Sequence, residues 1–325
     1  MNASTRRRRA TQSARSSAAG WFAVLLVIAS IAGLTCVIGA DRPDSAVGRK
    51  PSDDAHAPIA HAPARPRAPD ANDPTSSAIP DAGGIASSVH VALGIPTDAD
   101  PADDYLMDKG SYVLSYNAAR RVANWVSWYL NRSLLGSAHR RDKFLADDSL
   151  PPGFVRVSAH DYARSGYDRG HLCPSADRSD SDADNATTFL MTNMQPQLHE
   201  LNDGPWKDVE EHERVLARQG KDVFIIAGGV FGASPRTIGP SNVAVPDASY
   251  KIIVSLDAGQ RAADVTTATA VLAVIMPNQP GVSKKPWQQY AVSVDDVERA
   301  TGYDYLSRVA TAVQQVIEAR VTLGP

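Results

Sequence analysis

One segment, residues 167–210, constrains the chain most. It combines ionisable and amide side chains with apolar residues that are typical of buried strands. It contains the run Tyr167-Asp168-Arg169-Gly170-His171 and, further on, Asn202, Trp206 and Glu210. On a strand, Arg169 and His171 share one face, because successive side chains alternate. Gly170 between them permits another backbone or a ligand to approach closely. The segment is therefore the candidate functional centre, which the rest of the chain is expected to support or deliver.

Short apolar runs around this segment predict the fold class. Strands are expected in five runs: residues 112–116, 125–130, 223–227, 252–256 and 271–275. Helices are expected in three: residues 206–219, ended by Gly220, and residues 294–299 and 305–321. Gly228 and Gly229 are expected to end the third strand. Because strands and helices do not alternate strictly, the order predicts an α+β fold with a mainly antiparallel central sheet flanked by helices.

The N-terminal residues predict export. Residues 1–20 are polar and basic, with four arginines at positions 6–9, and form a predicted cytoplasmic tail. Residues 21–40 carry no charge and are long enough to cross the ~30 Å hydrocarbon layer as a helix. The arginines before this run predict an inner-membrane anchor with the bulk of the chain facing the periplasm. A cleaved signal peptide, which would give a secreted protein, is the alternative.

A flexible linker and one large domain are expected to follow. Residues 41–87 are rich in Ala, Pro, Asp and Ser and contain almost no large apolar side chains, which predicts a partly extended linker. Residues 88–325 form the predicted folded domain. Residues 96–325 hold 23 Lys+Arg against 29 Asp+Glu, a net charge of −6. Bulk charge therefore gives no support to nucleic-acid binding, and any phosphate substrate must be recognised by a local site.

Two groups of residues in the central segment suit attack on a phosphodiester. Such a reaction needs a base for water and positive charge near the phosphate oxygens. His171 can accept a proton at neutral pH, because an imidazole titrates near pH ~6.5, and Arg169 supplies charge on the same strand face. By spacing alone, the two residues also fit a surface salt-bridge network.

The second group suits a metal ion. Asn202, Trp206 and Glu210 are spaced i, i+4 and i+8, so they lie along one side of a helix. An amide and a carboxylate there could hold a hydrated divalent cation, and Mg²⁺ keeps several waters in so sparse a site. Alternatively, Asn202 is the N-cap of a helix that carries Pro205 in its first turn.

The two groups together resemble the DNA/RNA non-specific endonucleases, the ββα-metal family that includes mitochondrial endonuclease G and secreted sugar-non-specific nucleases. The resemblance is carried by Ser165-Gly166-Tyr167-Asp168-Arg169-Gly170-His171, Pro174-Ser175-Ala176-Asp177-Arg178, Phe189-Leu190-Met191-Thr192-Asn193-Met194, and Asn202, Trp206 and Glu210. It extends over essentially everything after the linker and is strongest toward the cyanobacterial type of this nuclease.

The resemblance implies a role for each matching residue. His171 is the general base that activates water, and Asn202 is the only direct protein ligand of Mg²⁺ or Mn²⁺. Glu210 acts on the metal through water, and Arg169 contacts the phosphate. Arg140 best fits the position of a second, upstream arginine, with Arg141 as the fallback. Asp168 is expected to be structural, because it should point to the opposite strand face from Arg169 and His171.

The implied fold is the ββα-metal (His-Me finger) nuclease fold. The implied activity is Mg²⁺-dependent hydrolysis of single- and double-stranded DNA and RNA to 5′-phosphorylated products. The alternatives are a catalytically idle nucleic-acid-binding module and a phosphodiesterase for small molecules. The partners that the resemblance allows include an inhibitor protein, whose identity the sequence does not indicate.

Overall fold

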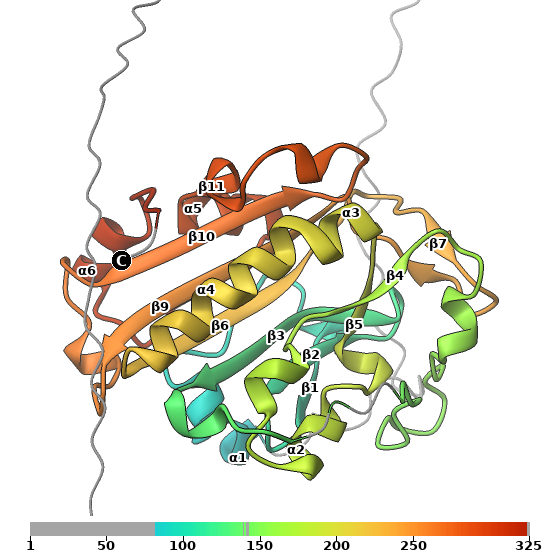
Figure 1. Ribbon diagram of the computed structural model, residues 1–325, viewed down its shortest axis with the longest axis horizontal. Helices are drawn as coiled ribbons and strands as arrows, with labels where there is room; N and C mark the ends of the chain where they lie inside the picture. Colours follow the sequence, from blue (N-terminus) through green and yellow to red (C-terminus); the bar gives the residue numbers. More distant parts are fainter. Residues whose placement is uncertain (1–81, 139, 141–142, 324–325) are drawn as a thin grey trace, which may run out of the picture. The chain divides into compact units, whose positions relative to one another are not determined.

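A seven-stranded antiparallel sheet organises the part of the chain that the computed structural model describes, which comprises residues 82–138, 140 and 143–323 (Figure 1). Its strands lie in the order β1 (Tyr105–Asp108), β2 (Val113–Asn117), β3 (Val122–Leu130), β6 (Lys221–Val230), β9 (Ala248–Asp257), β10 (Ala270–Pro277) and β11 (Ala291–Val292). Every neighbouring pair in this sheet is antiparallel. The predicted α+β class with a mainly antiparallel sheet is confirmed.

The two central strands are longer than predicted. β6 and β9 pair in unbroken register from Lys221↔Asp257 to Val230↔Ala248, and almost all of their residues are buried. The prediction that Gly228 and Gly229 end the strand is wrong. A Cβ atom at Gly228 would lie 2.4 Å from the carbonyl oxygen of Asn124 on β3. Glycine therefore allows the strands to approach closely here and does not end β6.

Helices cover both faces of the sheet. α4 (Lys207–Arg218) lies along one face (Figure 1), where Val209 and Leu216 pack with Ile225 of β6. α5 (Val294–Thr301) and α6 (Thr311–Ile317) pack on the other face, against residues such as Ile226. Adjacent residues of β6 thus enter different cores, as the alternation of side chains along a strand requires.

Two helix predictions had different outcomes. The helix after Pro205 is confirmed, and it ends at Gly220, which adopts φ +89° after the cap residue Gln219. The expected helix over residues 305–321 is wrong in extent, because α6 covers only Thr311–Ile317. Leu306 has φ +53°, which a right-handed helix excludes, and the backbone N–H of Tyr305 donates to the Glu298 carboxylate.

A smaller module lies between β3 and β6 in sequence. β4 (Asp168–His171) pairs antiparallel with β5 (Met194–Gln197), and α3 (His199–Leu201), a π-helical turn (Asn202–Trp206) and α4 follow directly. The other helices and strands are α1 (Ala82–Ala86), α2 (Asp182–Thr187), β7 (Thr237–Ile238) and β8 (Val243–Ala244). The 3₁₀ turns are Val89–Val91, Pro101–Asp103, Arg132–Leu134, Ala159–Tyr162, Ser175–Arg178, Met191–Asn193, Ala262–Asp264, Val282–Lys284 and Trp287–Tyr290.

The predicted tail, anchor and most of the predicted linker fall outside the described residues. Ile85 of α1 is buried in the core, ahead of the expected boundary at residue 88. None of the helices in residues 82–138 and 143–323 combines the length and the apolar character needed to cross a bilayer.

Candidate active site

One cleft of about 830 Å³ gathers all of the residues that the sequence analysis selected for chemistry. Its lining includes His171, Arg169, Arg140, Asn202 and Glu210. β4 contributes the first two, the π-helical turn and α4 contribute the last two, and Arg140 comes from the segment before Phe144. Arg140 therefore lies where a phosphate contact is expected, while the fallback Arg141 lies outside the described residues.

β4 presents Arg169 and His171 to the cleft as the alternation of a strand predicts. Gly170 between them is opposite Gln195 on β5. A Cβ atom at Gly170 would lie 2.1 Å from Oε1 of Gln197, whose side chain is fully buried. Gly170 is therefore required by the packing of β5 behind the site.

His171 is held by contacts on its ring and on its backbone. Its ring meets Phe189 edge-on at 5.0 Å between centroids and Phe144 at 5.7 Å, and the residue is 9% exposed. Nε1 of the buried Trp206 donates to the carbonyl oxygen of His171 at 3.2 Å. The helix that carries Asn202 and Glu210 is thereby tied to the strand that carries His171.

The same two phenylalanine rings support both arginines. The Arg169 guanidinium lies 4.3 Å from the centroid of Phe144, and the Arg140 guanidinium lies 5.4 Å from that of Phe189. Nη1 of Arg140 also donates to Oγ of Ser175 at 3.2 Å. Among the described residues, Arg169 forms no ion pair, which argues against the salt-bridge interpretation of this strand.

Asn202 is not an N-cap, so that alternative is wrong. Its backbone is helical (φ −61°, ψ −48°), and its N–H donates to the carbonyl oxygen of Leu198. The chain kinks two residues later at Gly204 (φ −112°, ψ −124°), just before Pro205. Nδ2 of Asn202 donates to Oδ2 of Asp168 at 3.1 Å. The amide oxygen of Asn202 receives no hydrogen bond from the described residues. It is therefore available as an acceptor or as a metal ligand.

The expected place of Asp168 is corrected. Its side chain lines the same cleft as Arg169 and His171. Asp168 is the first residue of β4 and pairs with Gln197, two residues before α3 begins. Its carboxylate therefore reaches the start of the helix and not the far face of the strand. There it also contacts Nδ1 of the exposed His199 at 2.8 Å, and this hydrogen bond raises the pKa of His199.

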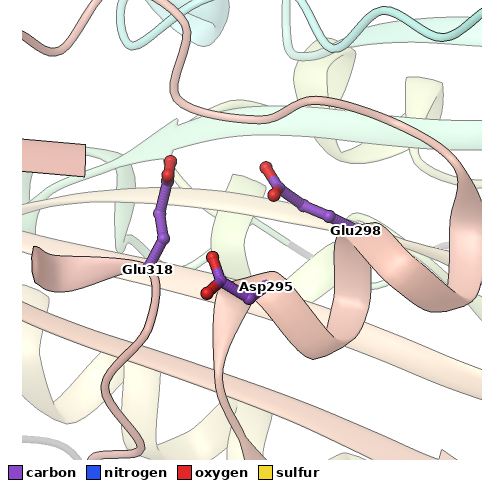
Figure 2. A group of neighbouring side chains, drawn as sticks. All are labelled: Asp295, Glu298 and Glu318. Carbon is purple, nitrogen blue, oxygen red and sulfur yellow. The ribbon is translucent and has the colours of Figure 1, made fainter. Parts of the chain in front are cut away.

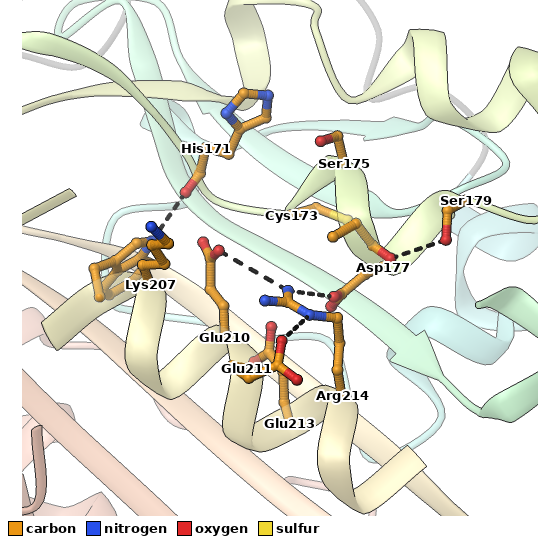
Figure 3. A network of polar contacts seen from close by, with 12 residues as sticks. His171, Cys173, Ser175, Asp177, Ser179, Lys207, Glu210, Glu211, Glu213 and Arg214 are labelled. Carbon is orange, nitrogen blue, oxygen red and sulfur yellow. Dashed lines mark hydrogen bonds and ion pairs between the residues drawn. The ribbon is translucent and has the colours of Figure 1, made fainter. Parts of the chain in front are cut away.

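Arg214 is a site residue that the sequence analysis missed. Its guanidinium lies 3.1 Å from Asp177, 3.1 Å from Glu211 and 4.0 Å from Glu210. Figure 3 shows the Glu210 carboxylate between His171 and this guanidinium. Asp177 is itself fixed by Nε1 of Trp128 at 2.9 Å. The spacing of four residues from Glu210 on a helix was the available signal.

Glu210 occupies a mostly buried position with few direct partners. Its side chain is 14% exposed, and burial raises its pKa to about 7, although Lys251 and Arg214 lower it. Beneath it, Lys251 of β9 and Glu213 of α4 form a fully buried ion pair, with Nζ 3.2 Å from Oε2. The Lys251 ammonium also lies 4.6 Å from the centroid of the Trp206 ring.

Cys173 and Asn193 support the site structurally. Cys173 is buried, and burial raises the pKa of its thiol. The Asn193 side chain accepts from the backbone N–H of Cys173 and donates to its carbonyl oxygen, each at 2.9 Å. These bonds fix the chain just after His171.

The cleft is locally basic and contains oxygen ligands for a hard cation. Its lining carries five basic side chains (Arg140, Arg164, Arg169, Lys207, Arg214) and three acidic ones (Asp168, Asp203, Glu210). The amide oxygen of Asn202 and the carboxylate of Glu210 are the donor types that Mg²⁺ and Mn²⁺ prefer. The residues present therefore fit a hydrated divalent cation, and the local charge contrasts with the acidic balance of the domain.

Comparison with known proteins finds similar nucleases. The sequence profile of a family described as DNA/RNA non-specific endonuclease matches residues 92–312. A protein of Nostoc sp. (strain PCC 7120 / SAG 25.82 / UTEX 2576) named nuclease is 46% identical over 241 residues, which are 72% of this chain and 86% of that protein. The mitochondrial nuclease EXOG of Danio rerio is 34% identical over 231 residues, covering 66% of this chain and 64% of EXOG. The chain thus spans under two thirds of EXOG's length.

A solved structure is similar as well. A chain in the crystal structure of the EndoG/EndoGI complex superposes with a TM-score of 0.61 at 28% sequence identity, covering 72% of this chain and 95% of that chain. The similarity extends over almost the whole of that chain.

Proposed function

The chain belongs to the DNA/RNA non-specific endonuclease family, and from this membership we propose that it cleaves both DNA and RNA with Mg²⁺ or Mn²⁺, leaving 5′-phosphate ends. Family membership and its ββα-metal fold make it a nucleic-acid hydrolase. The observation that carries the finer proposal is the convergence of His171, Asn202, Glu210 and two arginines in one cleft.

His171 is the proposed general base. A neutral imidazole can take a proton from water as the water attacks phosphorus. The contacts with Phe144 and Phe189 restrict the ring's rotation, and the Trp206 bond to its carbonyl fixes the backbone beneath it. The side chain therefore needs little reorganisation when substrate binds.

Arg169 and Arg140 are the proposed phosphate contacts. Guanidinium groups laid over aromatic rings keep their N–H groups directed sideways, where they can donate to phosphate oxygens. Positive charge held in this way stabilises the extra negative charge that develops in the transition state. Arg214 is proposed to act indirectly: its guanidinium lies beside both the Glu210 and the Asp177 carboxylates and would hold them in position.

Asn202 is the proposed direct ligand of the cation, and Glu210 is proposed to act through water. Asp168 orients the Asn202 amide, because it accepts from Nδ2 and so directs the amide oxygen away from itself. When bound, the cation would supply positive charge to the leaving 3′ oxygen.

The shape of the site favours a polymer as substrate. The cleft is wide and lined mainly by polar side chains from β4, the turn before it and α4, whereas small-molecule sites are mostly apolar and enclose their ligand.

The full set of His171, Asn202 and Glu210 argues against an idle binding module. An inhibitor protein would be expected to cover this cleft. Export through residues 21–40, as anchor or as signal peptide, completes the proposal.

The testing experiment compares the full chain with His171→Ala on supercoiled plasmid and on structured RNA, in Mg²⁺ and in EDTA. We expect metal-dependent loss of both substrates and a decrease of at least ~10²-fold in the variant, because a general base contributes about that much. His160→Ala, at an exposed position, is the matched control and should retain full activity. Cleavage that survives His171→Ala would overturn the assignment of the base, and binding without cleavage by the parent chain would favour the idle module.

A further inference from the structure

Three carboxylates lie close together on the face of the sheet that α5 and α6 cover (Figure 2). Asp295 and Glu298 come from α5, and Glu318 follows α6. One oxygen of each lies within 4.8 Å of one oxygen of each of the others. The backbone N–H of Asp295 donates to the carbonyl oxygen of Glu318, so this group forms the junction between α5 and the C-terminal segment.

Glu318 is buried in a way that calls for a ligand. The residue is only 8% exposed, and its Oε1 is buried without a hydrogen-bond partner in the described part of the chain. A buried carboxylate oxygen left without a partner is costly. Burial first, and then the nearby Glu298 and Asp295, raise the pKa of Glu318 to about 8.

The side chains nearby do not neutralise this group. Within the described residues, Asp295, Glu298 and Glu318 form no ion pair with a basic side chain. Arg299 pairs with Asp296, and Arg320 donates to the carbonyl oxygens of Thr267 and Thr269. The backbone N–H of Tyr305 donates to the Glu298 carboxylate at 3.0 Å, a contact that favours its charged form. If all three carboxyl groups were ionised, three like charges would face one another without a counterion from the described part of the protein.

We propose that Asp295, Glu298 and Glu318 bind a divalent cation, with Ca²⁺ the best fit, and that this cation fastens the C-terminal segment to α5. Carboxylate oxygens are ligands for hard cations, and Ca²⁺ accepts six to eight oxygens in flexible geometry, with water filling the remaining positions. Mg²⁺ demands nearly ideal octahedral geometry, which suits three carboxylates on two different segments less well.

The expected role of this cation is structural. Val297 and Ile317, close to the three carboxylates in sequence, are fully buried in the core on this face of the sheet. A cation that joins these segments would hold α5 and α6 in place against β9 and β10. The site shares no residue with the cleft of His171, so its occupancy should be separable from nuclease activity.

The test measures Ca²⁺ binding by isothermal titration calorimetry on the full, metal-free chain carrying Asn202→Ala, which disables the candidate site in the cleft. We expect one bound Ca²⁺ and a melting temperature that rises by roughly 4 °C or more at 100-fold excess over Kd. Adding Glu318→Gln should weaken binding at least tenfold and abolish the thermal shift. Asp148→Asn, which removes a carboxylate that is 96% exposed, is the matched control and should leave both unchanged.

Three results would overturn the proposal: no Ca²⁺ binding by the Asn202→Ala chain, unchanged affinity after Glu318→Gln, or equal weakening by Asp148→Asn. Glu318→Gln replaces a buried carboxyl group, whose charged form its acidic neighbours disfavour, with a neutral amide of similar size, so it should fold. Glu298→Gln is the second variant, and it should also weaken Ca²⁺ binding. Mg²⁺ titrated in place of Ca²⁺ should bind more weakly.

Discussion

Glu210 illustrates how one side chain can oppose folding while it serves a site. Its carboxyl group is mostly buried beside Arg214, and burial raises its pKa to about 7 from an ordinary value of 4.5. When the pKa of a carboxyl group is higher in the folded protein than in the unfolded chain, its contribution to stability is full at pH values below the pKa of the unfolded chain. That contribution is lost as pH rises through the pKa of the folded protein. In the metal-free protein, the stability contributed by Glu210 should therefore fall between about pH 4.5 and pH 7.

Glu210→Gln should remove that dependence. We expect the metal-free variant to match the parent near pH 4.5 and to exceed it by about 3 kcal/mol at pH 7.5, since each pKa unit corresponds to about 1.4 kcal/mol. Urea unfolding of both chains across this range measures the difference. Glu211→Gln is the control, because hydrogen bonds and charge from Arg218 and Arg214 lower the pKa of the half-exposed Glu211 despite its burial. A pH-independent difference for Glu210→Gln would contradict the expectation.

Single residues differed in how far the sequence could predict them. Arg169 and His171 were placed correctly because strand alternation is a local rule, and the spacing of four from Asn202 to Trp206 indicated one side of a helix. Asp168 was misplaced because that rule fails where a strand ends and the next element, here α3, comes close. Arg214 was missed because its partner Asp177 lies far away in sequence, and only the packing of α4 brings them together.

At the scale of elements, a buried ion pair couples α4 to the sheet. Lys251 of β9 and Glu213 of α4 are both fully buried, and the Lys251 ammonium lies near the Trp206 and Trp128 rings. Glu213 lies on α4 one turn from Glu210, so the ion pair fixes the helix at the height where it lines the cleft. Removing one partner should cost more than removing both.

Lys251→Met is the corresponding test. We expect a loss of about 3–5 kcal/mol in the free energy of unfolding, because Glu213 becomes a buried charge without a partner. The double variant Lys251→Met with Glu213→Gln should recover most of that loss, and denaturant unfolding of the parent, both single variants and the double variant measures the coupling. Equal stability of parent and Lys251→Met would show that the pair contributes nothing to holding α4.

The elements themselves were largely predictable where sequence is apolar and β-branched. β3, β6, β9 and β10 follow from such runs, and Gly220 ends α4 as expected. The C-terminal helix was overestimated because Tyr305, Leu306 and Val309 are apolar at helical spacing. In the structure Tyr305 is buried in the core, and Leu306 adopts a positive φ. The kink at Gly204 depends on tertiary packing and was not predicted.

For the molecule as a whole, the net charge has the same sign as the expected nucleic-acid substrate, whereas the cleft is locally basic. Residues 96–325 have a net charge of −6, whereas the cleft lining holds five basic and three acidic side chains. An acidic surface repels a polyanion at long range, and salt screens both this repulsion and the local attraction. Binding should nonetheless weaken with salt, because contacts with phosphate release counterions.

Raising NaCl from 50 to 200 mM should lower the apparent affinity for duplex DNA roughly 40-fold if three phosphates are contacted. Arg164→Ala, in the cleft lining, should reduce the slope of log affinity against log salt by about one, while Arg261→Ala at a remote exposed position should not change it. Cleavage rates at substrate concentrations below KM give the measurement. A flat dependence would mean that phosphate contacts contribute little to binding.

The place of the ββα module in the sheet has a consequence for folding kinetics. β3 and β6 are neighbours, with Leu130 paired to Val223, so residues 131–222 form an excursion between two adjoining strands. Closing so long a loop is entropically expensive, and folds rich in such distant pairings form slowly. Every side chain of the cleft lies within this excursion, while the buried partner of α4, Lys251, comes only from β9. A newly made chain should therefore gain activity late, after the C-terminal strands have joined the sheet.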